Sequence, residues 1–122
     1  MRSATMRLWL AGVVIQARAF GLCILDGVFN DFRDEDGFLA ECRYGVLLGF
    51  DGKTVIHPVQ VAGANVAFAP DDAEVAEARA IVAAFARPEN AGRGVLSLDG
   101  KTVERLHLEM LQGFIAKIQP AS

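Results

Sequence analysis

Apolar residues recur every three to four positions in several stretches of the chain, a spacing typical of amphipathic helices. The predicted helices span residues 5–20, 35–48, 59–66, 73–86 and about 102–118. Residues that favour helix ends support these bounds. Gly21 and Gly49 are stop signals, Asp34 is a predicted N-cap, and either Asp71 or Asp72 is another.

Three short apolar runs lie between these helices and predict strands over residues 22–25, 54–56 and 95–98. The first run is continuously apolar, which is typical of a strand buried on both faces. Strands that alternate with helices predict parallel βα units, in which ligands gather at the C-terminal ends of the strands. We therefore expect two candidate site segments, residues 26–36 and 57–60.

One five-residue motif, Asp-Gly-Lys-Thr-Val, occurs twice, at residues 51–55 and 99–103. A duplication would also require the flanking residues to match, and they do not. Two unrelated uses of an Asp-Gly turn beside a strand are therefore favoured.

The composition narrows the class of protein. Hydrophobic residues make up 52% and charged residues 22% of the chain, which supports a folded core and excludes a disordered chain. Twelve basic residues against fifteen acidic ones, with no basic cluster, argue against a nucleic-acid partner. The apolar run over residues 8–17 is too short to span a membrane. Two cysteines are too few for a disulfide scaffold, so a cytoplasmic location is expected.

The first twenty residues allow two interpretations. A basic start, an apolar stretch and the sequence Ala17-Arg18-Ala19 follow the order of a secretory signal peptide. The same residues also fit the amphipathic helix over 5–20. We favour the helix, because an arginine inside the cleavage motif is unusual and because the following strand needs a helix to cover it.

Motifs that define a mechanism by themselves are absent, since no GxGxxG, Walker A, zinc-ligand or GxSxG pattern occurs. The acidic loop over 26–36 is similar to a calcium loop but lacks its closing glutamate, so a solvated loop is favoured. Within that loop, Asp26 near a strand end is the best candidate ligand. His57, directly after a strand, could be a site residue or a structural histidine. Cys23 and Cys42 are expected in the core, and Glu104 and His107 on a solvated face.

Several motifs together resemble the HpcH/HpaI aldolase and citrate lyase family, most closely its citrate lyase beta-subunit-like CoA ester lyases. The resemblance covers about residues 14–116. The motifs that carry it are Ala17-Arg18-Ala19-Phe20-Gly21-Leu22, Leu25-Asp26-Gly27-Val28, Gly49-Phe50-Asp51-Gly52-Lys53, Ile56-His57-Pro58 with Gln60, Asn65, Phe68 and Pro70 with Glu74-Val75 and Ala78, Gly94-Val95, and Leu98-Asp99-Gly100-Lys101.

The resemblance implies an α/β fold, because members of this family are (β/α)₈ TIM barrels. A complete barrel needs about 250 residues, roughly twice the length of this chain. Residues 1–70 would supply the last two strands of the barrel with their βα units. Residues 71–122 would form a helical lid extension over the site of a neighbouring subunit. The shared lid implies a homo-oligomer, a trimer or hexamer, for the full-length protein.

The resemblance also implies a chemistry, the reversible Mg²⁺-dependent carbon–carbon cleavage of an acyl-CoA such as malyl-, citramalyl- or citryl-CoA. Family members take their Mg²⁺ ligands and a substrate-binding arginine from earlier strands, so we assign no metal ligand to this chain. Ile56, His57 and Pro58 match a segment that lines the acyl-CoA pocket. Glu104 matches the acid/base carboxylate of the lid, where many members carry aspartate, and Thr102 replaces their usual methionine.

Two interpretations of the role of this 122-residue chain remain open. In the first, it is the C-terminal fragment of a CoA ester lyase, and the isolated 122 residues are inactive. In the second, it is an inactive stand-alone module, or the product of a decayed gene, that associates with a complete lyase.

Overall fold

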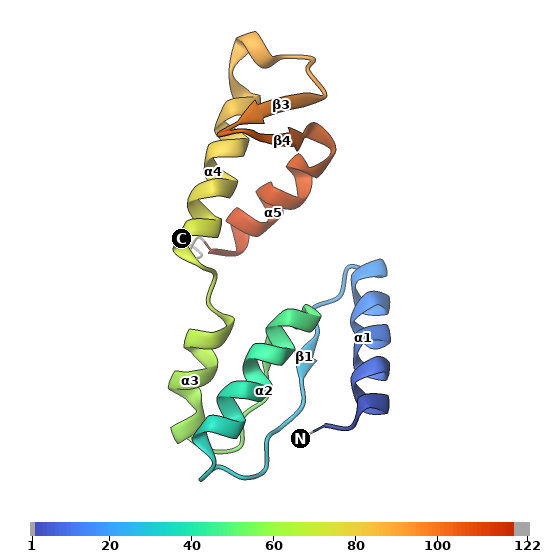
Figure 1. The fold of residues 1–122 in the computed structure, drawn as a ribbon, viewed down its shortest axis with the longest axis vertical. Helices are drawn as coiled ribbons and strands as arrows, with labels where there is room; N and C mark the ends of the chain where they lie inside the picture. Colours follow the sequence, from blue (N-terminus) through green and yellow to red (C-terminus); the bar gives the residue numbers. More distant parts are fainter. Residues whose placement is uncertain (1, 119–122) are drawn as a thin grey trace. The chain divides into compact units, whose positions relative to one another are not determined.

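The computed structural model describes residues 2–118, and the chain divides into two compact units, Met1–Ala69 and Pro70–Ser122 (Figure 1). The first unit contains three helices and two short strands: α1 (Ala4–Ala19), β1 (Leu25–Asp26), α2 (Glu35–Leu48), β2 (Gly52–Lys53) and α3 (Val59–Phe68). The second contains α4 (Asp72–Ala86), a 3₁₀ turn η1 (Pro88–Asn90), β3 (Val95–Leu98), β4 (Lys101–Glu104), η2 (Arg105–His107) and α5 (Leu108–Ile118).

The helix ends follow the predicted capping chemistry. The Asp34 carboxylate accepts a hydrogen bond from the Gly37 N–H at 2.9 Å, and Gly49 ends α2 in the left-handed conformation at φ 97°. The Asp71 carboxylate accepts from the Ala73 N–H at 3.0 Å and so caps α4. The predicted helices over 5–20, 35–48 and 73–86 are therefore confirmed to within one residue at each end.

The first unit contains a parallel strand pair, as predicted, but the strands lie elsewhere along the sequence. β1 pairs with β2 in the register Leu25 to Gly52 and Asp26 to Lys53. The predicted bounds, 22–25 and 54–56, are therefore wrong by one to three residues. Leu22 is not available to a strand, because its N–H donates to the Ala17 carbonyl and completes the end of α1.

The expectation that the first strand is buried on both faces is also wrong for this chain. Leu22 is 59% exposed and Leu25 is 58% exposed. Cys23 is exposed too, whereas Cys42 lies in the core as expected. The core of the unit forms between α2 and α3, where Phe38, Cys42 and Ala64 pack together.

The predicted helix from about Thr102 is wrong in its first part, because β3 turns back into β4 as an antiparallel hairpin. Asp99 at φ 50° and Gly100 at φ 77° make the two-residue turn. Asp-Gly is a preferred sequence for such a turn, since both central residues need a positive φ. The helix begins only at Leu108, and Leu96 of β3 is buried against Ile81 and Phe85 of α4.

The two copies of the Asp-Gly-Lys-Thr-Val motif have different structures, which supports two unrelated uses. In the first copy, Gly52 and Lys53 form a parallel strand. In the second, Asp99-Gly100 is the turn of the antiparallel hairpin and Lys101 begins β4.

Over residues 2–118, the strands form two separate two-stranded sheets and no closed barrel. The mixture of helices with a parallel strand pair agrees with the predicted α/β class. The assignment of residues 1–70 to the last part of a barrel and of 71–122 to a lid stays a prediction.

The close packing of α2 against β1 gives a test of the fold. A Cβ added at Gly45 would lie 3.2 Å from Asp26 Oδ2 and 3.3 Å from Phe68 Cζ. Because Asp26 is held by hydrogen bonds on both oxygens, we expect Gly45→Ala to lower the free energy of unfolding by about 1–2 kcal/mol despite its better helix propensity. The measurement is urea unfolding followed through Trp9 and Tyr44, the single tryptophan and tyrosine, which both lie in the first unit.

Gly12→Ala is the matched control, since a Cβ added at that helical position would meet no atom within 4 Å beyond the neighbouring backbone of its own helix. This variant should raise the unfolding free energy by up to about 1 kcal/mol. Equal gains at both glycines would show that the contact between α2 and Asp26 is looser than described.

Candidate functional site

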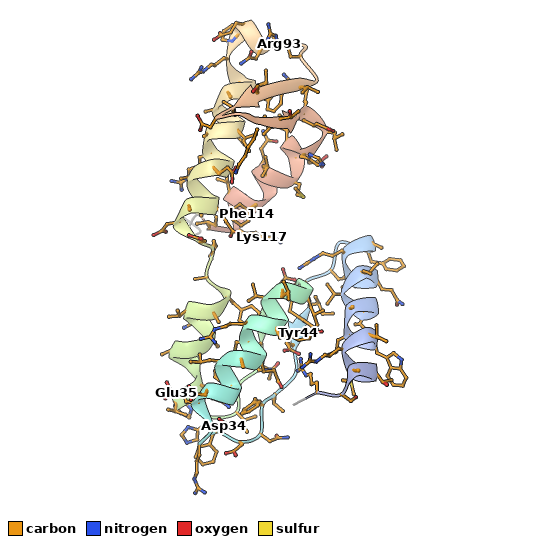
Figure 2. The ribbon with its side chains drawn as sticks, viewed as in Figure 1. Asp34, Glu35, Tyr44, Arg93, Phe114 and Lys117 are labelled. Carbon is orange, nitrogen blue, oxygen red and sulfur yellow. The ribbon has the colours of Figure 1, made fainter. Side chains whose placement is uncertain are left out.

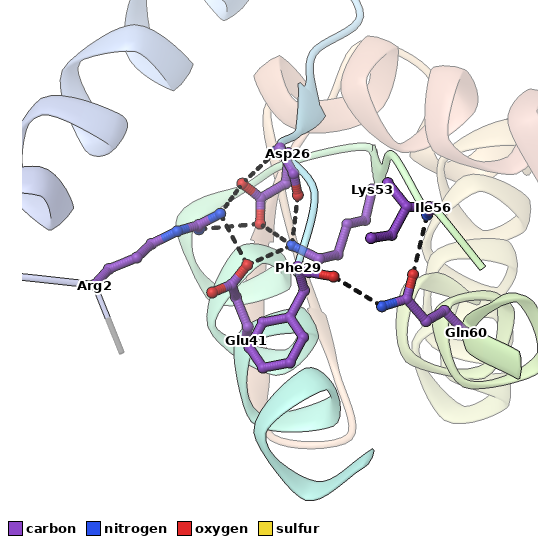
Figure 3. A network of polar contacts seen from close by, with 8 residues as sticks. Arg2, Asp26, Phe29, Glu41, Lys53, Ile56 and Gln60 are labelled. Carbon is purple, nitrogen blue, oxygen red and sulfur yellow. Dashed lines mark hydrogen bonds and ion pairs between the residues drawn. The ribbon is translucent and has the colours of Figure 1, made fainter. Parts of the chain in front are cut away.

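Two oppositely charged side chains meet where the parallel strands end. Asp26 is the last residue of β1 and Lys53 the last residue of β2, and they are register partners. Lys53 Nζ donates to Asp26 Oδ2 at 3.2 Å and to the Gly27 carbonyl at 2.7 Å (Figure 3). Neither side chain is exposed to solvent. Since charged groups are costly to bury alone, each side chain makes burial of the other tolerable.

Arg2 and Glu41 complete this group, which we call the ion cluster: Arg2, Asp26, Glu41 and Lys53. The Arg2 guanidinium donates to both Asp26 oxygens, at 3.0 and 2.6 Å, and to Glu41 Oε1 at 3.1 Å. Lys53 Nζ donates to the same Glu41 oxygen at 2.6 Å. Two cations and two carboxylates balance, so the cluster carries no net charge. It joins the segment before α1, both strand ends and α2.

The surroundings of Asp26 favour its ionised form. Burial alone would raise the pKa of this carboxyl, but hydrogen bonds from Arg2 and Lys53 and their positive charges hold the pKa below its usual value. Together with the Gly27 N–H, these donors give Asp26 four hydrogen bonds. Asp26 is therefore a structural ion-pair partner, and its oxygens are already engaged within the chain.

The Ile56–Pro58 segment begins three residues after the end of β2 and lies beside the loop that follows β1. The His57 ring stacks on Phe32, with centroids 4.4 Å apart and planes within 8°. His57 Nδ1 accepts a hydrogen bond from the Val59 N–H at 3.2 Å, at the start of α3. In the neutral ring this bond places the proton on Nε2, which makes Nε2 a hydrogen-bond donor. Ile56 and Pro58 are exposed.

Gln60, on the first turn of α3, connects the two loops. Its Oε1 accepts from the Ile56 N–H at 3.0 Å, and its Nε2 donates to the Phe29 carbonyl at 2.9 Å (Figure 3). Gln60 is 2% exposed. The two predicted site segments, 26–36 and 57–60, are thus in contact within the first unit.

A pocket of about 370 Å³ adjoins the ion cluster between α1, α2 and the loop after β1. Its lining includes Arg7, Phe29, Asp34 and Tyr44, of which Asp34 and Tyr44 are labelled in Figure 2. The Arg7 guanidinium lies over the Tyr44 ring, 4.7 Å from its centroid. The pocket is mixed in character, with arginine and carboxylate side chains beside aromatic rings.

Glu104, the predicted acid/base residue, is the last residue of β4 and is exposed. It lies in the second unit, whereas Ile56, His57 and Pro58 lie in the first. Glu104 and His107 are both exposed, as expected, but they stand on β4 and η2 rather than on one helix.

The acidic loop does not form a cation site. The Asp31 carboxylate accepts from the Arg33 N–H at 3.2 Å, Asp34 caps α2, and Asp26 belongs to the ion cluster. Within residues 2–118, no three histidine, cysteine or acidic side chains converge to hold a metal ion. The residues described here therefore do not fit a Mg²⁺ site by themselves.

Two partners of the cluster, Arg2 and Glu41, carry no signal in the sequence pattern. Lys53 and Gln60 stand inside the motifs quoted above, but sequence reasoning gave them no role. Lys53 could have been found, because it follows Asp51-Gly52 at the start of a predicted βα unit, and the ends of parallel strands meet at one edge of the sheet. Its pairing with Asp26 required the correct register, which the strand prediction missed.

The fold has counterparts among solved structures of citrate lyase proteins. CitE from Mycobacterium tuberculosis, in complex with magnesium, acetoacetate and coenzyme A, matches 96% of this chain over 45% of its own length, with TM-score 0.71 and 28% identity. A citrate lyase from Burkholderia xenovorans LB400 matches 93% of this chain over 35% of its own, with TM-score 0.78 and 20% identity. These matches define the class as the α/β fold of citrate lyase proteins.

Residues 6–58 match the model of the HpcH/HpaI aldolase/citrate lyase family. The chain is 49% identical over 106 residues to a (3S)-malyl-CoA thioesterase from Cereibacter sphaeroides (strain ATCC 17025). It is also 37% identical over 103 residues to the mitochondrial citramalyl-CoA lyase of Rattus norvegicus. The chain is therefore similar to the HpcH/HpaI aldolase/citrate lyase family, as its motifs indicate.

The matches cover most of this chain but a smaller part of each relative. They span 87% of the chain and 37% of the thioesterase, and 84% of the chain and 30% of the citramalyl-CoA lyase. In residues 2–118, no helix is long and apolar enough to cross a membrane.

The lowered pKa of Asp26 predicts how acid affects stability. The native pKa lies below the unfolded value of about 3.9, so the carboxylate contributes stability above that pH. The contribution is lost as the pH falls through the native pKa. We expect the difference in unfolding free energy between wild type and Asp26→Asn to be constant from pH 7 to 5 and to shrink below pH 4. Urea unfolding at a series of pH values measures it, and a constant difference down to pH 2.5 would contradict it.

Proposed function

We propose that this chain is the C-terminal part of a CoA ester lyase that cleaves a carbon–carbon bond in malyl-, citramalyl- or citryl-CoA. The observation that carries the proposal is the position of the Ile56–Pro58 segment. It follows the end of a parallel strand, where α/β folds bind ligands. It also lies in a stretch shared with relatives named for malyl-CoA and citramalyl-CoA.

His57, Ile56 and Pro58 bind the acyl-CoA in this proposal. The Nε2–H of His57 is a donor for a carbonyl or carboxylate oxygen, since Nδ1 is engaged by the Val59 N–H. The exposed Ile56 and Pro58 beside it offer apolar contacts of the kind that the thioester arm of coenzyme A needs. Stacking on Phe32 fixes the plane of the imidazole and thus the direction of the donor.

Glu104 is the proposed acid/base group. It ends β4 and is exposed. In the homo-oligomer that the family resemblance implies, a trimer or hexamer, this carboxylate reaches the acyl-CoA bound to a neighbouring subunit. There it takes or returns the proton of the carbon released by cleavage. Its side chain is one methylene longer than the aspartate common in the family, and a shift of about 1 Å can alter a rate greatly.

In this proposal, the Mg²⁺ ligands lie outside these 122 residues. CitE from Mycobacterium tuberculosis was crystallised with magnesium, but in this chain Asp34 caps α2, and Asp26 belongs to the ion cluster. We therefore expect the isolated chain to have no activity on malyl-CoA.

Thioester hydrolysis is the second candidate function, because the Cereibacter sphaeroides relatives are named (3S)-malyl-CoA thioesterases. The two reactions share a substrate and differ in the bond that breaks. Carbon–carbon cleavage of malyl-CoA gives acetyl-CoA and glyoxylate, whereas hydrolysis gives malate and free coenzyme A.

A non-enzymatic alternative is an inactive module that associates with a complete lyase. Exposed apolar side chains on α1, including Leu8, Trp9 and Ile15, offer a surface for such association. The location of the protein, expected to be cytoplasmic, stays a prediction under either alternative.

A chimera tests the enzyme proposal. In it, this chain replaces the matching part of the (3S)-malyl-CoA thioesterase from Cereibacter sphaeroides, which is 49% identical over 106 residues. We expect the chimera to consume malyl-CoA and the isolated chain not to do so. Glu104→Gln should lower kcat by about 10²–10⁴, the usual contribution of general acid–base catalysis. His57→Ala should mainly raise KM, by about tenfold, the size of one hydrogen bond.

His107→Ala and Glu109→Gln are the matched controls, since both residues are exposed and neither has a role in the proposal. Product analysis distinguishes cleavage from hydrolysis. An active chimera that tolerates both Glu104→Gln and His57→Ala would refute the assigned roles. Turnover by the isolated chain would refute the expectation that essential groups lie outside it.

A further inference from the structure

We infer that Gln60 is a positioning residue, which holds the Ile56–Pro58 segment in one conformation against the loop that follows β1. The functional role of this positioning rests on the proposed function, since the Ile56–Pro58 segment is the proposed acyl-CoA contact. The arrangement itself is independent of that proposal, and it follows from one buried side-chain amide that bonds to two loops.

Both ends of the Gln60 amide have a partner of the matching kind. The oxygen accepts from the Ile56 N–H at 3.0 Å, and the nitrogen donates to the Phe29 carbonyl at 2.9 Å. Only one orientation of the amide satisfies both groups, because an N–H cannot accept and a carbonyl cannot donate. At 2% exposure, water does not substitute readily for either partner.

The loop that carries Phe29 is itself anchored in the core. The Phe29 ring packs edge-on against Phe38, with centroids 6.0 Å apart, and Phe38 is buried on α2. Gln60 therefore bonds to a carbonyl that the core holds in place. The helix α3 that carries Gln60 also packs on this core through Ala64.

The far end of the same loop reaches His57. Phe32 lies three residues after Phe29 and stacks on the His57 ring at 4.4 Å. Ile56, whose N–H is bound by Gln60, immediately precedes His57. Gln60 thus fixes the backbone before His57 and the loop whose ring covers it. Loss of Gln60 should release both contacts, which would leave His57 less well placed for a ligand.

Two substitutions separate the two hydrogen bonds. Gln60→Met keeps the length and bulk of the side chain and removes both bonds. Gln60→Glu keeps an acceptor for the Ile56 N–H but cannot donate to the Phe29 carbonyl at neutral pH. Gln16→Met is the matched control, because Gln16 is exposed on α1.

The test is amide hydrogen exchange and side-chain NMR on the full 122-residue chain. We expect Gln60→Met to speed exchange at Ile56 by about tenfold, and Gln60→Glu to leave that exchange near its wild-type rate. Both variants should lose the ring-current shift that Phe32 imposes on the His57 protons. Gln16→Met should change neither signal. If Gln60→Met does not fold, Gln60→Glu and Phe32→Leu replace it in the test. Phe32→Leu should lose the ring-current shift of the His57 protons, while the Ile56 amide should exchange at its wild-type rate.

Unchanged exchange at Ile56 and an unchanged His57 shift in Gln60→Met would overturn the inference. Titration with acetyl-CoA tests separately whether the Ile56–Pro58 segment contacts the acyl-CoA. If acetyl-CoA shifts the NMR signals of residues 56–59 in the wild type, we expect Gln60→Met to raise the dissociation constant obtained from those shifts by about tenfold. A wild type without such changes would count against acyl-CoA contact by this segment, while the exchange data would still decide the role of Gln60.

Discussion

The first unit depends on the buried ion pair between Asp26 and Lys53. The strands that these residues end are two residues long, and such a pair provides few backbone hydrogen bonds of its own. Neither charged side chain reaches solvent, so each needs the other, and Arg2 and Glu41 supply the remaining partners. Removing one member of a buried pair typically costs about 3–5 kcal/mol, because the other charge is then left buried without its counterion.

The position of this pair explains why the candidate site lies where it does. Pairing the last residues of two parallel strands brings the following loops together at the same end of the sheet. The Thr54 N–H then donates to the Asp26 carbonyl at 3.0 Å and continues the pairing toward Ile56. Leu25 on β1 is exposed, and the sheet has only these two strands within the described residues. The chain spans 30–40% of the length of the curated relatives named here.

The helices were predictable because their signals are local. Asp34 and Gly49 act through hydrogen bonds within a few residues, and both ends of α2 were placed correctly. The strand over 95–98 was also placed correctly. The two parallel strands were not, because their register depends on the contact between Asp26 and Lys53, which are 27 residues apart. The hairpin at Asp99-Gly100 carried a recognisable turn signal, but the apolar spacing after Thr102 suggested a helix. For the site, His57 could be named from its motif, whereas its contacts with Phe32 and through Gln60 depend on packing between distant segments.

A double-mutant cycle on Asp26 and Lys53 tests this account most directly. The free energy of unfolding is measured for wild type, Asp26→Asn, Lys53→Met and the double variant at pH 7. If the buried pair holds the strand ends together, the double variant should be more stable than the sum of the single effects allows, with a coupling energy above about 1 kcal/mol. Effects that add to within about 0.5 kcal/mol would show that the two charges act independently and would contradict the account.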